Sequence, residues 1–246
     1  MNRKAILIES SRVCNLDDLP GARKDIENWI NFLQSNLGGA WNKSEIFEFH
    51  TPRSSQVETE LRVNADCYSF VVFSGHGSDG SIVLNDILDD YPIDDLIPTS
   101  HKKTVIIDSC RGPKQINAFS ASTSIFANRL IKESEAGVSL MPFLRKIDKH
   151  LHQEQWYSAL KKSSIGTVMM LSCSKGQSAD EDPSAGGYYT SLLLQGANNW
   201  KQCTSGSAVY WTDDAHSYAV KKLPPQQKPE YLPTHTNLSF PFAVTV

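Results

Sequence analysis

The sequence has no long hydrophobic run and no excess of basic residues. Its apolar stretches stay well below the roughly 18 residues that a membrane-spanning helix needs. Lys and Arg number 24 against 27 Asp and Glu, which gives a net charge of −3. Nucleic-acid-binding surfaces are usually basic, so this balance argues against such a partner. We expect neither a membrane nor a nucleic acid partner.

Paired cysteines are also missing. The five cysteines are odd in number, and no two have the CxxC spacing of a zinc or redox motif. The apolar run at 5–8 is too short for a signal peptide and fits a first strand. We therefore expect no disulfide framework, and a reducing, cytoplasmic compartment.

What the sequence does contain is an alternation of short apolar runs with helical patterns. The runs are apolar without strict alternation, which is typical of strands covered on both faces. This order predicts an α/β fold with a mostly parallel sheet and helices on both faces. The predicted strands are 4–9, 45–49, 70–74, 104–108, 167–172 and 240–244, and the predicted helices are 25–37, 54–63, 125–135, 147–162, 188–198 and 208–221.

The length of 246 residues suits one domain of this class. We expect a single domain over 1–246, with an insertion or mobile loop at about 113–144 and a C-terminal extension at about 223–246. The proline-rich stretch 223–233 is predicted to be a surface connection.

Two of the predicted strands end in residues that can carry chemistry. The run "FVVF" leads into Ser74-Gly-His76-Gly77, and the run "TVII" leads into Asp108-Ser-Cys110. In open parallel sheets ligands bind beyond the carboxyl ends of the strands, and neighbouring strands lie about 5 Å apart. A histidine and a cysteine at adjacent strand ends can form a nucleophile pair. The glycines allow a sharp turn, and the N–H of Gly77 could stabilise an oxyanion.

These two motifs resemble those of the caspase and metacaspase superfamily of cysteine peptidases. "SGHG" is followed by "DSCRG", with Cys110 lying 34 residues after His76. The Cys-Arg-Gly ending matches caspases, whereas the Asp-Ser-Cys beginning matches metacaspases. "MLSCSKGQSADED" and "GGYYTSLLL" are also similar to segments that follow the catalytic cysteine in metacaspases. The resemblance implies a caspase-like three-layer sandwich similar to the short prokaryotic metacaspases, with His76 and Cys110 as catalytic residues.

The resemblance also implies a specificity for basic residues. "LPGARKD" is similar to the metacaspase motif Leu-x-Gly-Cys-x-x-Asp and supplies Asp25, with Ala22 in place of the cysteine. Asp108 and Ser74 match two further positions of the family's pocket. Two carboxylates in one partly desolvated pocket repel unless a cation lies between them, so we expect arginine or lysine at the cleaved position. Arg111 is expected to support its loop rather than to bind substrate.

The same resemblance raises two further questions, whether the protein binds calcium and how it is activated. Many metacaspases bind calcium through aspartates, and "LDDYPIDDL" offers Asp89, Asp90, Asp94 and Asp95. No matching acid follows Cys110 in "RGPKQINAFS", so we expect a solvated acidic surface and no cofactor, with calcium as the alternative. Basic residues after Cys110 offer sites for self-cleavage, and a protein partner is the other possible activator.

Two other functions are compatible with the sequence. One is a catalytically silent caspase-like binding module, which would not need His76, Cys110 and both pocket acids. The other is a non-peptidase hydrolase with the same Cys–His chemistry, which would not need two acids in its pocket. A fluorogenic peptide ending in arginine separates the three.

Overall fold

The computed structural model describes residues 2–13, 16–85, 90–112 and 142–246. Its centre is a six-stranded sheet in the order β12-β8-β7-β3-β1-β2. All of these strands run parallel except β12, which pairs antiparallel with β8. Their bounds are β1 Arg3–Ser10, β2 Ile46–His50, β3 Tyr68–Gly75, β7 Lys102–Asp108, β8 Gly166–Leu171 and β12 Glu230–Pro233.

Helices pack on both faces of the sheet and produce three layers. One core lies under α1 (Pro20–Gln34), α3 (Pro142–Lys162), α4 (Tyr188–Gln202) and α5 (Thr212–Val220). The other lies under α2 (Ser54–Leu61) and the short 3-10 helix η2 (Ile93–Leu96). Along β1, Ala5 and Leu7 enter the first core, whereas Ile6 and Ile8 enter the second. Because both faces are covered, the strands are apolar throughout. The predicted α/β class with a mostly parallel sheet is confirmed.

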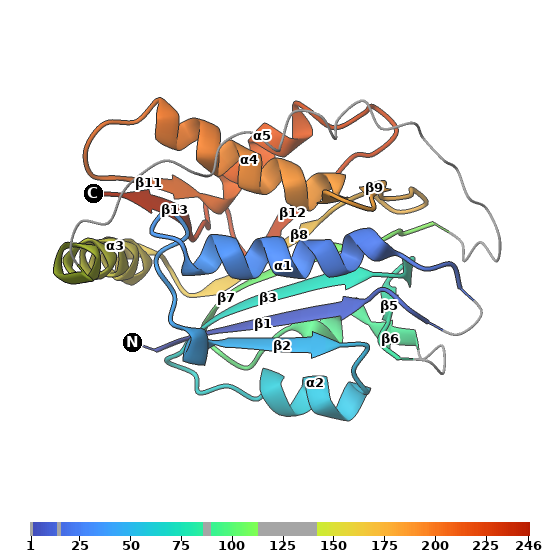
Figure 1. Cartoon of the computed structure of the whole chain (residues 1–246). Coiled ribbons are helices and arrows are strands. Elements are labelled where there is room, and N and C mark those ends of the chain that lie inside the picture. The colour runs from blue at the N-terminus through green and yellow to red at the C-terminus, as the bar shows by residue number, and fades with distance from the viewer. Residues whose placement is uncertain (1, 14–15, 86–89, 113–141) are drawn as a thin grey trace.

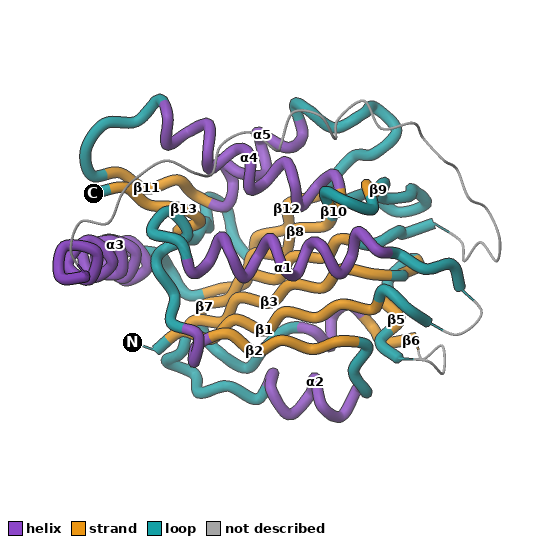
Figure 2. The backbone as a smooth tube through the Cα atoms, in the orientation of Figure 1, coloured by secondary structure: helices purple, strands orange, loops and turns teal. Residues whose placement is uncertain are grey.

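Smaller sheets flank the two ends of the main sheet. In Figure 1 the arrowheads of β1, β2 and β3 point toward the end at which β5, β6 and β9 lie. Figure 2 shows β11 and β13 near the opposite end. The smaller sheets are β4 (Gly77–Ser78) with β5 (Ser81–Val83) and β6 (Asp90–Pro92), β9 (Glu181–Asp182) with β10 (Gly186–Gly187), and β11 (Ala208–Trp211) with β13 (Pro241–Thr245).

The register of the parallel strands brings the two predicted motifs to one edge. Glu9 of β1 pairs with Ser74 of β3, and Ser74 pairs in turn with Asp108 of β7. Cys110 therefore follows its strand at the same level at which His76 follows the neighbouring strand. The prediction that the two strands are parallel neighbours is confirmed.

The structure differs from the sequence prediction in the C-terminal part. The predicted helix at 208–221 is β11 followed by α5, because Ala208–Trp211 pairs with β13. The predicted surface connection at 223–233 ends in β12, whose Leu232 pairs with Met169 of β8. An edge position tolerates Pro233, which has no N–H to donate. Four-residue strands have too few positions to show a periodicity, so their pairing was not visible in the sequence.

Other predicted boundaries shift or lie outside the described residues. The first helix begins at Pro20, five residues before its predicted start at 25, with proline in its first turn. The helix predicted at 147–162 begins at Pro142. The helix predicted at 125–135 lies outside the described residues, as does most of the insertion predicted at 113–144. Within the described ranges, no helix combines the length and apolar character needed to cross a membrane.

The last strand closes the core beneath α1. Phe242 of β13 packs its ring 5.8 Å from that of Trp29 and 5.2 Å from that of Phe32. It also lies 6.3 Å from the ring of Tyr210 in β11. Residues late in the chain thus complete a core that the first helix begins.

We expect Phe242→Ala to lower the free energy of unfolding by about 3–5 kcal/mol, because it removes a buried ring from this aromatic cluster. Urea unfolding monitored by tryptophan fluorescence measures the change. Leu232→Ala is the control: its side chain is 48% exposed, and we expect a change within about 0.5 kcal/mol. Equal stability of the two variants would contradict a structural role for the C-terminal strand.

Candidate active site

The turns that carry His76 and Cys110 lie directly against one another. Gly75 ends β3 with φ +154°, and a Cβ there would lie 2.8 Å from the carbonyl oxygen of Ser10. A Cβ on Gly77 would lie 2.9 Å from the carbonyl oxygen of Cys110 and 2.6 Å from Ser109 Oγ. Both glycines therefore permit a close approach that a larger residue would prevent. The structure brings the histidine turn and the cysteine turn together.

One ring nitrogen of His76 is held by the backbone. Its Nε2 lies 2.7 Å from the carbonyl oxygen of Asp17. A carbonyl can only accept, so Nε2 carries the proton and Nδ1 of the neutral ring is left as the base. Burial lowers the pKa of His76, against the opposing effects of the Asp17 carbonyl and of the Asp17 and Asp18 carboxylates. The lowered pKa favours the neutral ring, in which Nδ1 is the nitrogen that can accept a proton.

Cys110 is partly buried and its thiol is neutral in this conformation. Its Sγ donates to the carbonyl oxygen of Ala179 over 3.7 Å. Burial raises the pKa of the Cys110 thiol, and the charges of Asp108 and Asp180 raise it further. Hydrogen bonding with the backbone of Ala179 and with the side chain of Ser178 lowers the pKa of the thiol. The thiol must leave this environment, or lose its proton to a base, to become a nucleophile.

The loop that follows Cys110 is fixed to two other segments. The backbone of Arg111 exchanges hydrogen bonds with Gln177 (2.9 Å) and Gly176 (2.8 Å). Its Nη1 donates to Glu230 Oε2 of β12 (2.6 Å) and to the carbonyl oxygen of Cys173 (3.3 Å). The guanidinium therefore holds the loop in place and does not enter the pocket. Sequence reasoning missed Glu230, because its segment was predicted to be a surface connection.

The three predicted pocket residues also come together. Ser74 Oγ donates to Asp25 Oδ2 over 2.6 Å. Asp108 Oδ2 accepts from both the N–H (3.0 Å) and the hydroxyl (2.8 Å) of Thr190. Burial raises the pKa of Asp25 well above its usual value, and the nearby charge of Asp108 raises it further. Burial also raises the pKa of Asp108. Thr190, at the start of α4, was not predicted as part of the site.

The pocket is more deeply buried than expected. Asp25 is 1% exposed and Asp108 is 5% exposed, whereas the sequence suggested a partly desolvated pocket. The N–H of Gly187 donates to Asp25 Oδ1 over 2.9 Å. A Cβ on Gly187 would lie 3.0 Å from Asp25 Oδ2 and would overlap Asp108 Oδ2. The backbone of β10 thus lies against both carboxylates and closes the pocket.

Glu181 is a further acid beside the pocket that the sequence did not reveal. Its Oε1 accepts from the N–H of Gly21 at 3.3 Å, at the start of α1, where no side chain of the preceding residue caps the helix. Burial raises the pKa of Glu181 to about 7, against the hydrogen bonds from Gly21 and Ala22. Asp108 and Asp182 add like charge in the same direction. The motif "SADED" marks this segment, but only the fold places it at the helix.

The acidic segment considered for calcium is described from Asp90 onward. No group of three or more His, Cys, Asp or Glu side chains described there could hold a metal ion. Asp94 and Asp95 lie in η2, and Asp90 accepts a 3.5 Å hydrogen bond from Ser81. Asp89 lies outside the described residues.

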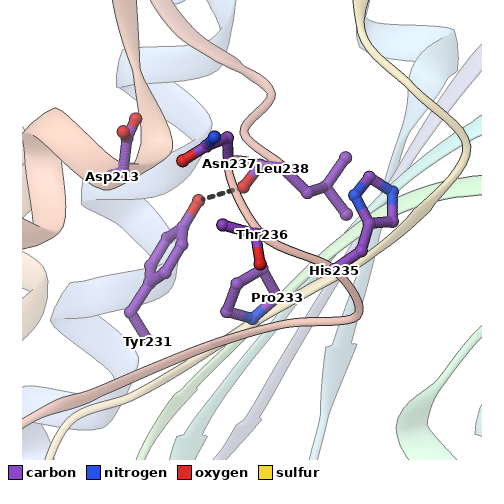
Figure 3. Close-up of a pocket in the computed structure, with 7 residues that line it drawn as sticks. All are labelled: Asp213, Tyr231, Pro233, His235, Thr236, Asn237 and Leu238. Atoms are coloured by element: carbon purple, nitrogen blue, oxygen red, sulfur yellow. Dashed lines mark hydrogen bonds between the residues drawn. The ribbon is translucent and has the colours of Figure 1, made fainter.

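A cavity of about 550 Å³ lies elsewhere, lined by residues late in the chain, and Figure 3 shows its lining side chains. Its lining comes from α5, β12 and the loop after β12, and Tyr231 donates to the carbonyl oxygen of Leu238 over 2.9 Å. His235 is bonded through Nε2 to the carbonyl oxygen of Ile165 (2.9 Å). This cavity contains none of the predicted site residues.

Comparisons with known proteins give one matching family model and two solved structures of similar fold. The family model described as "Caspase domain" matches residues 2–236. The structure of caspase-1 from Spodoptera frugiperda is similar, with a TM-score of 0.59, 14% identity, and coverage of 96% of this chain and 88% of that one. A protein from Geobacter sulfurreducens is also similar, with a TM-score of 0.56, 14% identity, and coverage of 95% and 93%. Among curated protein sequences, none matches the chain.

The raised pKa of Glu181 predicts a pH-dependent stability. The folded state binds this proton more tightly than the unfolded chain does, so stability is lost as the pH rises from about 4.5 to about 7. Glu181→Gln keeps an acceptor for Gly21 but has no proton to lose. We expect it to match the wild type below pH 4.5 and to be more stable above pH 7, as measured by urea unfolding.

Glu27→Gln, on the exposed face of α1, is the control for this comparison and should show no such gain above pH 7. A Glu181→Gln variant that is less stable than the wild type at pH 8 would show that the ionised carboxylate is needed at the helix start.

Proposed function

The chain belongs to the caspase-domain family, and we propose that it is a cysteine endopeptidase that cleaves after arginine or lysine. Cys110 is the nucleophile and His76 is the general base and acid. The observation that carries the proposal is the contact between the two turns, with Gly77 against the carbonyl of Cys110. The hydrogen bond from His76 Nε2 to Asp17 supports the role of Nδ1 as the base.

The proposed reaction needs only groups of this chain and water. Nδ1 of His76 takes the proton of the Cys110 thiol, and the thiolate attacks the peptide carbonyl carbon. The N–H of Gly77 helps to stabilise the resulting oxyanion. The imidazolium then protonates the leaving amine, which departs and leaves a thioester on Cys110. Water, deprotonated by His76, hydrolyses this thioester and restores the thiol.

Specificity rests on the pair of acids. Asp25 and Asp108 lie close enough for the charge of Asp108 to raise the pKa of Asp25. A basic side chain between them lowers this repulsion and gains charge-assisted hydrogen bonds. A substrate aspartate would instead add like charge at a cost of several kcal/mol. Arginine should be at least as good as lysine, because its planar fork can meet two carboxylates.

We place the protein in a reducing, cytoplasmic compartment, with protein or peptide substrates. In the described part of the chain Cys67, Cys110, Cys173 and Cys203 are free, which supports this assignment. Self-cleavage after a basic residue or a protein partner is proposed as the activating event. Three of the basic residues suggested for self-cleavage, Lys114, Arg129 and Lys132, lie outside the described residues.

We expect Cys110→Ala and His76→Ala each to lower the cleavage of a fluorogenic arginine peptide by roughly 1,000-fold or more. The double variant should be no worse than either single variant, since the two residues act as a unit. Cys203→Ala, an exposed free cysteine, is the control and should retain full activity. Retained activity in Cys110→Ala would assign the chemistry elsewhere, and inactivity of the activated wild type toward all peptides would favour a silent binding module.

The specificity prediction is tested with a positional-scanning peptide library. We expect arginine and lysine to be preferred, and Asp25→Asn or Asp108→Asn to lower kcat/KM for arginine peptides by roughly 30-fold or more, which corresponds to about 2 kcal/mol. Iodoacetamide should still alkylate Cys110 in both variants. Asp66→Asn, before β3 at the other end of the sheet, is the control. A preference for aspartate, or for an apolar residue, would refute the basic pocket.

A further inference from the structure

We propose that residues 178–187 form an autoinhibitory cover, which must move away from the site before a basic side chain can enter. This stretch, called the cover segment below, runs from the region of Cys110 to the two pocket acids and includes β9 and β10. The inference deepens the proposed function, because it concerns the regulation of the same site.

At one end the cover segment fills the pocket. The N–H of Gly187 donates to Asp25 Oδ1 over 2.9 Å, and the opposite oxygen of Asp25 accepts from Ser74. Both oxygens of Asp25 therefore have partners in the protein. The close approach of Gly187 to both carboxylates leaves no room even for a methyl group. A guanidinium is larger than a methyl group, so it cannot lie between the two acids in this conformation.

At its other end the cover segment holds the nucleophile. The Cys110 thiol donates to the carbonyl oxygen of Ala179. A thiol has one proton, so while it donates to Ala179 it does not donate to His76. The same short stretch of chain thus lies against both pocket acids and accepts the hydrogen bond of the thiol.

The cover segment is attached by hydrogen bonds and not by the hydrophobic cores. None of its residues belongs to either core cluster. Asn28 Nδ2 of α1 donates to the carbonyl oxygen of Ala185 over 2.9 Å. Asp182 Oδ1 shapes the turn by accepting from the N–H groups of Ser184 (2.8 Å) and Ala185 (3.0 Å). The segment can therefore move while the sheet and its helices stay packed.

A basic ligand would shift the position of the cover. Such a ligand binds the acids only when the cover is open, so it stabilises the open state by its affinity for that state. Its apparent dissociation constant is the intrinsic constant divided by the open fraction. The alkylation rate of Cys110 scales with the same fraction, because the thiol is released with the cover. Loosening the cover should change both quantities by the same factor.

The first test loosens the cover without touching the catalytic or pocket residues. In Asn28→Ala and Asp182→Ala we expect alkylation of Cys110 by iodoacetamide to accelerate about fivefold or more. The dissociation constant of benzamidine, an arginine-like cation, should fall by the same factor, as measured by calorimetry. Asn198→Ala, which removes a similar 3.1 Å bond to Leu194 within α4, is the matched control and should change neither.

Buried Cys173 monitors the fold in the same samples. It should stay unlabelled in every variant, since its side chain is fully buried beneath the loop of Cys110. If alkylation of Cys110 is unchanged in both Asn28→Ala and Asp182→Ala while Cys173 stays protected, the proposal of a cover is overturned. Faster alkylation without any binding of benzamidine would uphold the cover and refute the basic pocket, so the two proposals fail separately.

A second measurement uses the wild-type protein and does not depend on the variants folding. With saturating benzamidine, we expect the backbone amides of 180–187 to exchange with deuterium faster, because the cover is displaced. The amides of β3 and β7 should be unaffected. Slower exchange of 180–187 would show that the segment closes onto the cation as a pocket wall, which would overturn the proposal.

Discussion

The parallel pairing of β3 with β7 in a single register is the constraint on which the site depends. Ser74 lies opposite Asp108, so the residues that follow each strand start from the same level. A shift of this register by one residue would move Ser74 and Asp108 to different faces of the sheet. The pocket acids, the glycine turns and the Cys–His arrangement all follow from this one alignment. The helices and smaller sheets supply further residues at an edge of the sheet whose alignment the register already determines.

Burying two carboxylates side by side is unfavourable, and the structure shows how the cost is reduced. Each acid accepts hydrogen bonds within the protein, from Ser74 and Gly187 for Asp25 and from Thr190 for Asp108. Burial raises the pKa of both, which favours a protonated acid over two adjacent charges. The buried pair is thus tolerated as a neutral or singly charged unit. A cation from outside is the alternative that would let both ionise.

How much of this could be predicted from the sequence depended on the range of the interactions involved. The central strands were visible because each is a continuous apolar run, and the order of strands and helices was enough for the fold class. Asp25 and Asp108 were picked out by resemblance to a family motif, not by any local pattern. Glu230, Thr190 and Gly187 could not be predicted. Their roles arise from contacts with residues far away in the chain, and from backbone N–H groups that every sequence contains.

The late position of β12 and β13 in the chain has a consequence during synthesis of the protein. Glu230 anchors the loop of Cys110 through Arg111, and Phe242 completes the core beneath α1. Both residues are synthesised long after Cys110 itself. While the chain is still on the ribosome, the loop lacks its anchor and the first helix lacks part of its packing. A nascent chain therefore carries the cysteine and the histidine without the framework that aligns them until synthesis has passed residue 242.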